Sequence, residues 1–119
     1  MNKIIGMLSI VTTLAISAVS FAGATGGPKF VNDTVVLGNS TDYYTVYFRG
    51  NEFARVVMKG EGSSDLDCYL YDQNGNLVAQ DLNSEDFCEL KFAPRWTGPF
   101  VIYVRNLGDN PNMYSMRTN

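Results

Sequence analysis

Carboxylates are the side chains with the clearest capacity for chemistry in this sequence, and two of them stand close together at the start of the stretch 65–72. Asp65 and Asp67 are separated by one residue, so in a β-strand both point to the same face. Oxygen ligands grouped in this way suit Ca²⁺. A solvated acidic face beside the loop 61–64 explains the same pattern, and both interpretations stay open at this stage.

Five tyrosines fall on the polar-facing phase of stretches that alternate between apolar and polar residues. Tyrosine is frequent at interfaces because it combines a large apolar area with a hydroxyl group. If these stretches share one sheet, the rings form an aromatic surface suited to a polymer or a protein. Ordinary cross-strand pairing is the alternative explanation. The five residues are Tyr43, Tyr47, Tyr69, Tyr71 and Tyr103.

Catalysis has little support in this composition. The sequence contains no histidine, which excludes a nucleophile activated by a Ser-His or Cys-His pair. Carboxylate pairs such as Glu85 with Asp86 are formally suited to glycoside hydrolysis. A chain this short leaves little room for a substrate cleft, so we predict that the protein is not an enzyme.

Two cysteines lie on the apolar phase of predicted strands. Cys68 shares its phase with Leu70, and Cys88 shares its phase with Leu90. We therefore predict a buried Cys68–Cys88 disulfide between neighbouring strands. Closing this loop would stabilise the fold by about 3 kcal/mol. Two free buried thiols are the alternative, whereas a zinc site is disfavoured by the small number of ligands.

The first 22 residues have the pattern of a signal peptide. Lys3 precedes an apolar run over 4–18, and small residues allow cleavage after Ala22 or after Ala24. A membrane anchor is the alternative, but the run is shorter than the ~20 residues that a span needs. The sequence thus predicts a secreted or periplasmic protein, a location where disulfides persist.

The charge balance limits the kinds of partner. The formal net charge is −3, and losing Lys3 with the leader makes it more negative by one unit. Nucleic acid and an anionic membrane surface are therefore poor partners. No other long apolar run is present, so we expect no membrane association after cleavage. The oligomeric state has no signature in the sequence.

The remaining chain predicts an all-β domain. Residues 23–41 are predicted to be flexible with one short strand near 34–37, and a β-sandwich domain spans 42–119. Short alternating stretches at about ten-residue spacing predict seven or eight mostly antiparallel strands in a jelly-roll-like sandwich. Trp96 is expected to plug one end. The firmest strands are 43–48, 53–59, 65–72, 77–80, 87–92, 100–105 and 114–117.

Several short motifs follow one another in a fixed order across 42–119: Asp42-Tyr43-Tyr44, Gly50, the stretch 65–72, Asn74-Gly75, Thr97-Gly98-Pro99-Phe100 and Tyr114. This order resembles the bacterial pre-peptidase C-terminal domain, a family of small β-sandwiches appended to secreted proteases and related to the collagen-binding domains of clostridial collagenases. The resemblance implies a β-sandwich that aids secretion or binds a substrate polymer. It also adds weight to calcium at Asp65 and Asp67, because the collagen-binding relatives hold calcium. Cys68 departs from the family pattern, which has an aliphatic residue there.

We therefore predict a non-catalytic secreted binding or accessory module. It would engage an extracellular polysaccharide or an exported protein through the tyrosine-bearing surface. One alternative is a structural envelope protein whose partners are other subunits. Another is an inhibitor or chaperone of a separately encoded secreted protease. Apart from calcium, no cofactor is expected.

Overall fold

The computed structural model describes residues 23–62 and 65–119, and the predicted leader 1–22 lies outside this part. The described chain forms two four-stranded antiparallel sheets, which confirms the predicted all-β sandwich. Among the described residues, no helical segment has the length and apolar character of a membrane span. The strands are β1 (Phe30–Val36), β2 (Thr41–Phe48), β3 (Ala54–Gly60), β4 (Leu66–Asp72), β5 (Leu77–Asp81), β6 (Phe87–Phe92), β7 (Gly98–Asn106) and β8 (Asn112–Thr118).

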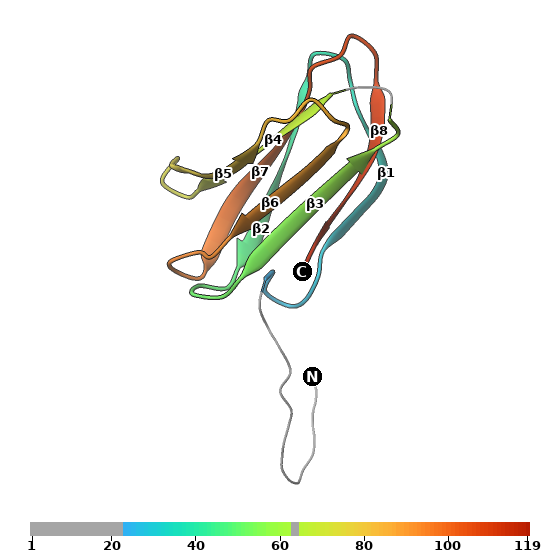
Figure 1. Cartoon of the computed structure of the whole chain (residues 1–119). Helices are drawn as coiled ribbons and strands as arrows, with labels where there is room; N and C mark the ends of the chain where they lie inside the picture. Colours follow the sequence, from blue (N-terminus) through green and yellow to red (C-terminus); the bar gives the residue numbers. More distant parts are fainter. Residues whose placement is uncertain (1–22, 63–64) are drawn as a thin grey trace, which may run out of the picture.

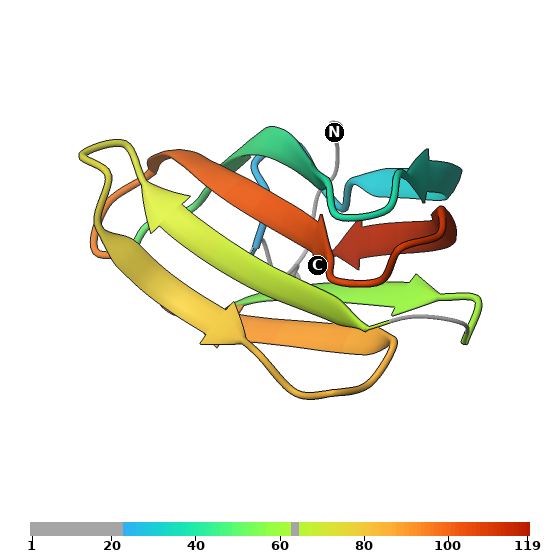
Figure 2. The same cartoon turned by 90° about the horizontal axis from the view of Figure 1, so that it is seen from above.

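The strand order is that of a jelly roll. Sheet A has the order β2-β7-β4-β5 and sheet B has the order β1-β8-β3-β6. Within these sheets β1 pairs with β8, β2 with β7, β3 with β6 and β4 with β5. The chain is thus a long antiparallel hairpin that wraps into two layers (Figure 1), and the layers are seen edge-on in Figure 2.

The core lies between the two sheets and is built from the alternate residues of each strand. β4 and β7 show this best, because their inward residues are fully buried while their outward tyrosines are half-buried. Phe48, Phe92 and Phe100 form an aromatic cluster with ring centroids 5.0 to 6.0 Å apart. Edge-on contacts of this kind add to the free energy of burial.

The two cysteines form the predicted disulfide, with Cα atoms 6.1 Å apart. The sequence-based placement of the strands was wrong in one respect. Cys68 lies on β4 in sheet A and Cys88 lies on β6 in sheet B, so the bond joins facing sheets rather than neighbouring strands. Alternation shows that a side chain points inward, but it does not show which sheet carries it.

The segment 23–41 contributes more to the fold than the sequence predicts. The short strand expected near 34–37 is β1, Phe30–Val36, at the edge of sheet B. Ahead of it, Ala24 is buried in the core and its N–H donates to the carbonyl of Asn119. Trp96 also differs from expectation, because its side chain is 38% exposed rather than buried as a plug.

Removing the disulfide tests how much the joined sheets depend on it. Replacing Cys68 and Cys88 together with Ala should lower the free energy of unfolding by about 3 kcal/mol, because the unfolded chain regains the freedom of the closed loop. Denaturant unfolding of the wild-type and double-variant proteins measures the difference. A midpoint that does not change would contradict this expectation. Reduced wild-type protein serves as the control for the loss of side-chain volume.

Candidate functional site

The outer face of sheet A carries four of the five predicted tyrosines in one patch. Tyr43 on β2 and Tyr69 on β4 are both register partners of Tyr103 on β7. The ring of Tyr103 lies 6.1 Å from that of Tyr43 and 5.4 Å, edge-on, from that of Tyr71. We call Tyr43, Tyr69, Tyr71 and Tyr103 the tyrosine face. The four rings are grouped because their strands lie in the order β2-β7-β4. The sequence alone left open whether these strands share one sheet.

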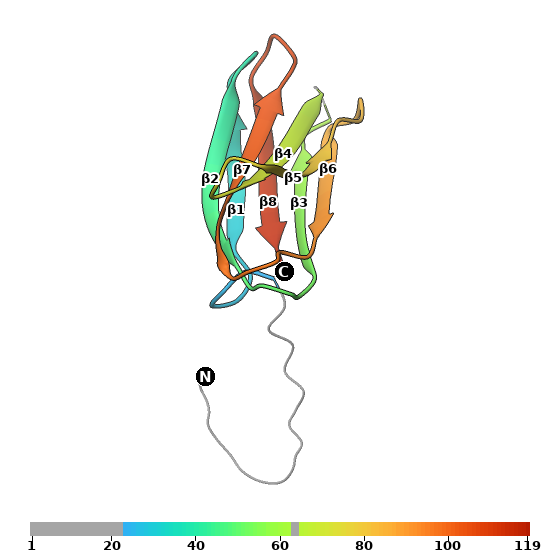
Figure 3. The same cartoon turned by 90° about the vertical axis from the view of Figure 1, so that its left-hand side faces the viewer.

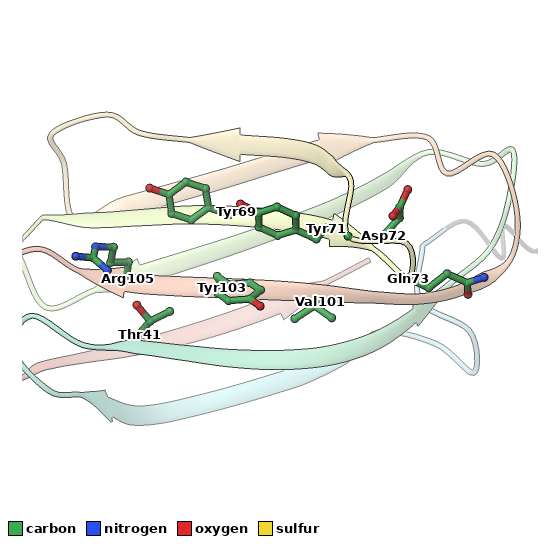
Figure 4. A pocket seen from close by; sticks show the side chains of 9 residues that line it. Thr41, Tyr69, Tyr71, Asp72, Gln73, Val101, Tyr103 and Arg105 are labelled. Carbon is green, nitrogen blue, oxygen red and sulfur yellow. The ribbon is translucent and has the colours of Figure 1, made fainter.

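An open groove of about 790 Å³ runs along this face. Figure 4 shows Tyr69 and Tyr71 on β4 beside Tyr103 on β7, with Arg105 at one end and Gln73 at the other. The aromatic rings offer flat apolar area, and their hydroxyls and the Arg105 guanidinium offer hydrogen bonds. These groups can hold a chain or a protein surface in place.

Tyr47 does not belong to the tyrosine face. It pairs with Pro99 near the opposite end of β2 and lines a separate hollow with Thr25 and Lys29. Its side chain is 56% exposed. The sequence placed it with the other four because alternation groups residues by face and not by position along a strand.

Asp67 and Asp65 occupy a different environment from the one expected of a solvated acidic face. Asp67 is only 8% exposed, and it lies opposite Arg105 in the register of β4 and β7. In the described part of the chain, one buried carboxylate oxygen of each residue, Oδ1, has no hydrogen-bond partner. Burial raises the pKa of Asp67, the nearby Asp65 and Asp81 raise it further, and Arg105 opposes them.

The described part of the structure does not supply a third acidic ligand for the predicted calcium site at Asp65 and Asp67. Among residues 23–62 and 65–119, no group of three or more Asp, Glu, Cys or His side chains is arranged to hold a metal ion. Carbonyl oxygens of the neighbouring loop would have to complete the coordination, which needs six to eight oxygens. Calcium at Asp65 and Asp67 therefore stays a prediction.

Asp72 has a structural role at the turn after β4. Its Oδ1 accepts the backbone N–H groups of Asn74 and Asn76, at 2.8 and 2.9 Å, and its Oδ2 accepts the Asn76 amide. The backbone N–H of Asn76 is the main cause of its lowered pKa. Gly75 adopts a φ of 82°, which suits glycine in such a turn. Asp72–Asn76 is thus a turn closed by hydrogen bonds to the Asp72 carboxylate.

One polar cluster escaped the sequence-based reasoning. The hydroxyl of Tyr114 on β8 donates to Oδ2 of Asp42 on β2, at 2.8 Å, and also contacts the hydroxyl of Tyr44. This cluster joins the two sheets through hydrogen bonds. Burial raises the pKa of Tyr114 far above its usual range, so the phenol stays neutral and can donate. The available signal was Asp42 itself, a charged residue on the inward phase of β2.

Comparisons with known proteins support the fold. No protein-family model matches the chain, and no curated protein matches its sequence. Several solved structures are similar, and two of them are described here. One is PliG of Aeromonas hydrophila, a periplasmic lysozyme inhibitor of g-type lysozyme, with 13% identity, a TM-score of 0.57, and coverage of 87% of this chain and 91% of that chain. The other is the pre-peptidase C-terminal domain of the collagenase of Bacillus anthracis, with 15% identity, a TM-score of 0.53, and coverage of 74% and 90%. At these identities the likeness concerns the fold.

The buried carboxylate of Asp67 should make stability depend on pH. A pKa raised in the folded state means that folding disfavours the charged form, so stability falls as pH rises through the folded-state pKa. Asp67→Asn, measured in EDTA, should raise the melting temperature by about 2–5 °C at pH 7. The gain should shrink below about pH 4, where the wild-type carboxylate is protonated. An equal gain at both pH values would contradict a charge effect.

Calcium binding is tested by thermal melting of the purified protein in EDTA and then in excess calcium. A ligand that binds only the native state raises the midpoint as its concentration exceeds its dissociation constant. If Asp65 and Asp67 hold calcium, Asp65→Asn should remove most of the rise. Glu52→Gln, a charge change in the β2–β3 loop, is the control. An unchanged midpoint in wild-type protein would end the calcium interpretation.

Proposed function

We propose that this protein is a non-catalytic extracytoplasmic module that binds another protein through the tyrosine face. The observation that carries this proposal is the set of four tyrosines that line or border one groove on the outer surface of sheet A. Tyr43, at the border, is 70% exposed, so its apolar area and hydroxyl are free to contact a partner. Rigid tyrosines of this kind often dominate binding energy at protein interfaces.

Several observations support the location and the absence of chemistry. The disulfide Cys68–Cys88 favours an oxidising compartment, and the leader expected over 1–22 would deliver the chain there. The similar inhibitor is described as periplasmic. Of the two similar structures described above, one is named as a lysozyme inhibitor and the other as the pre-peptidase C-terminal domain of a collagenase. The exact compartment, periplasm or medium, and membership of the pre-peptidase C-terminal family are part of this proposal.

The similar inhibitor favours a second candidate, which is inhibition of an exported enzyme. Blocking an enzyme needs a rigid surface that fits an open substrate cleft. The loop 107–111 extends beyond the strands at one end of this sandwich (Figure 3) and is a segment that could enter such a cleft. A secreted lysozyme or protease is the class of enzyme to test first. An activity assay with and without the purified protein separates this candidate from simple binding.

The tyrosine face is tested by paired substitutions on the same sheet. Tyr69→Ser with Tyr71→Ser should abolish retention of a protein partner from the exported protein fraction, because both rings border the groove. Tyr47→Ser, outside the face, should leave retention unchanged. Immobilised wild-type and variant proteins are compared by mass spectrometry of what they retain, and circular dichroism checks that each variant is folded.

Equal retention by the double variant and the wild-type protein would move the binding surface elsewhere. Retention on collagen, chitin or peptidoglycan instead of on a protein would favour the polymer interpretation. Self-association that depends on Tyr69 and Tyr71, measured by sedimentation, would favour the structural role.

A further inference from the structure

The outer face of sheet B carries half of the basic residues of the described chain. The sequence has nine Lys and Arg residues, and all except Lys3 lie in the described part, which leaves eight. The strands of sheet B lie side by side in the order β1-β8-β3-β6 (Figure 1), which brings outward side chains from distant segments together. Glu89 is the one acidic residue that alternates outward on β3, β6 or β8. The four basic residues on this face, all exposed, are Arg55, Lys59, Lys91 and Arg117.

A hollow of about 360 Å³ lies within this face. Arg55, Lys59 and Arg117 line it, and no acidic residue of the described chain does so. Val57 lies between Arg55 and Lys59 on β3, two residues from each. It is also the register partner of Arg117 on β8. The three cations therefore surround a half-buried apolar side chain, and all three border the same hollow.

Aromatic rings from both edge strands also line the hollow. Phe30 on β1 is 61% exposed, and Phe87 on β6 is 36% exposed. The guanidinium of Arg117 lies over the Phe30 ring, 6.0 Å from its centroid. A cation–π contact of this kind holds the arginine in place before a ligand arrives. The exposed area of both rings remains available for contact.

Two other interactions fix the lining. Arg55 forms an ion pair with Glu89 across β3 and β6. The bulge of β1 places Asn32 in the lining, and the N–H of Asp33 in this bulge donates to Oγ of Ser115 at 3.1 Å. Bulges re-aim side chains at the edges of sheets. The hollow is therefore largely preorganised, which reduces the conformational entropy lost on binding.

Acidic residues border the face beside Lys59. Asp33 and Glu61 line a separate small hollow with Lys59. The carboxylate of Asp86, just before β6, accepts the Asn112 amide at 2.6 Å. Lys59 nevertheless forms no ion pair within the described chain. These three carboxylates lower the positive potential around Lys59 without entering the lining of the main hollow.

The groups that line the main hollow suit an acidic sugar chain. Arg and Lys donate charge-assisted hydrogen bonds to carboxylate and sulfate groups. The Asn32 amide and the Ser115 hydroxyl can exchange hydrogen bonds with sugar hydroxyls. The negative face of a phenylalanine ring attracts the C–H groups of a sugar ring. The Cα atoms of Arg55 and Lys59 are about 13 Å apart along β3, so separate acidic groups of one extended chain can reach both.

Other anionic partners match this hollow less well. A membrane surface binds apolar side chains that insert between lipids, whereas these cations lie on the strands of a sheet with polar Asn32 and Ser115 beside them. The net charge of −3 does not prevent binding of an anion here. Salt limits the reach of exposed charges to about 8 Å at physiological ionic strength, so a ligand in the hollow responds mainly to the cations that line it.

We propose that the outer face of sheet B binds an acidic polysaccharide through the hollow lined by Arg55, Lys59 and Arg117. The cations hold the carboxylate or sulfate groups, and Phe30 and Phe87 contact the sugar rings. This goes beyond the proposed function, because it assigns a second surface and a different class of partner. The tyrosine face lies on the outer surface of the other sheet, so both surfaces can be occupied at once.

Binding of short oligosaccharides to the complete protein tests this proposal. The probes are oligogalacturonate, which carries carboxylates, and a heparin oligosaccharide, which also carries sulfates, with uncharged dextran as the control. Calorimetric titrations are made in EDTA, which excludes bridging by calcium. At least one acidic probe should bind and dextran should not. Binding should weaken about fivefold between low and physiological ionic strength, because salt screens exposed charges.

A matched pair of arginine substitutions locates the site. Arg117→Gln should weaken binding about fivefold, because it removes one exposed ionic contact from the hollow. Arg95→Gln makes the same charge change at an exposed residue of the loop between β6 and β7, outside the hollow, and should leave the affinity unchanged. Circular dichroism and thermal melting check that both variants are folded.

The aromatic contact is tested by a second pair. Phe30→Ser should weaken binding about threefold, because it removes the ring face and the support of Arg117. Leu77→Ser removes an apolar side chain that is 48% exposed on β5 of the other sheet, and should have no effect.

The proposal is overturned if neither acidic oligosaccharide binds at low salt, whether or not vesicles of phosphatidylglycerol retain the protein. It is equally overturned if Arg95→Gln weakens binding as much as Arg117→Gln, since the attraction would then reflect net charge alone. Binding of a single-stranded DNA of equal charge as tightly as the acidic sugars would also overturn it, because the hollow would then select charge and not sugar.

Discussion

The fold depends on one constraint, which is that the chain doubles back on itself at the turn Asp72–Asn76. The Asp72 carboxylate satisfies two backbone N–H groups there, and β4 and β5 leave the turn as an antiparallel pair. Every later strand of the second half then finds a partner in the first half. The jelly-roll order follows from wrapping this one hairpin into two layers.

Much of the architecture was predictable because a strand buried on one face must alternate. The stretch 65–72 shows alternation most clearly, and its inward residues proved buried as expected. Alternation carries no information on which sheet a strand joins, so Cys68 and Cys88 were correctly paired but assigned to neighbouring strands. β1 was shorter in prediction than in the structure because a bulge between Val31 and Thr34 interrupts its pattern.

The candidate site was harder to predict, because it depends on proximity between distant segments. The tyrosine face required β2, β7 and β4 to be adjacent, which no local pattern specifies. The hydrogen bonds among Asp42, Tyr44 and Tyr114 required sheet A to face sheet B in a particular register. The sequence showed which side chains are capable of binding, whereas the fold determined which of these side chains lie together.

The contact between Ala24 and Asn119 has a geometric consequence. Because Ala24 lies beside Asn119, the described chain begins and ends at the same pole of the sandwich, opposite the loops 37–40 and 107–111 (Figure 1). If a tether were attached at either end, the opposite pole of the sandwich would therefore face away from the point of attachment. A domain built in this way can be carried by a larger assembly, or stand alone, while presenting the same surface outward.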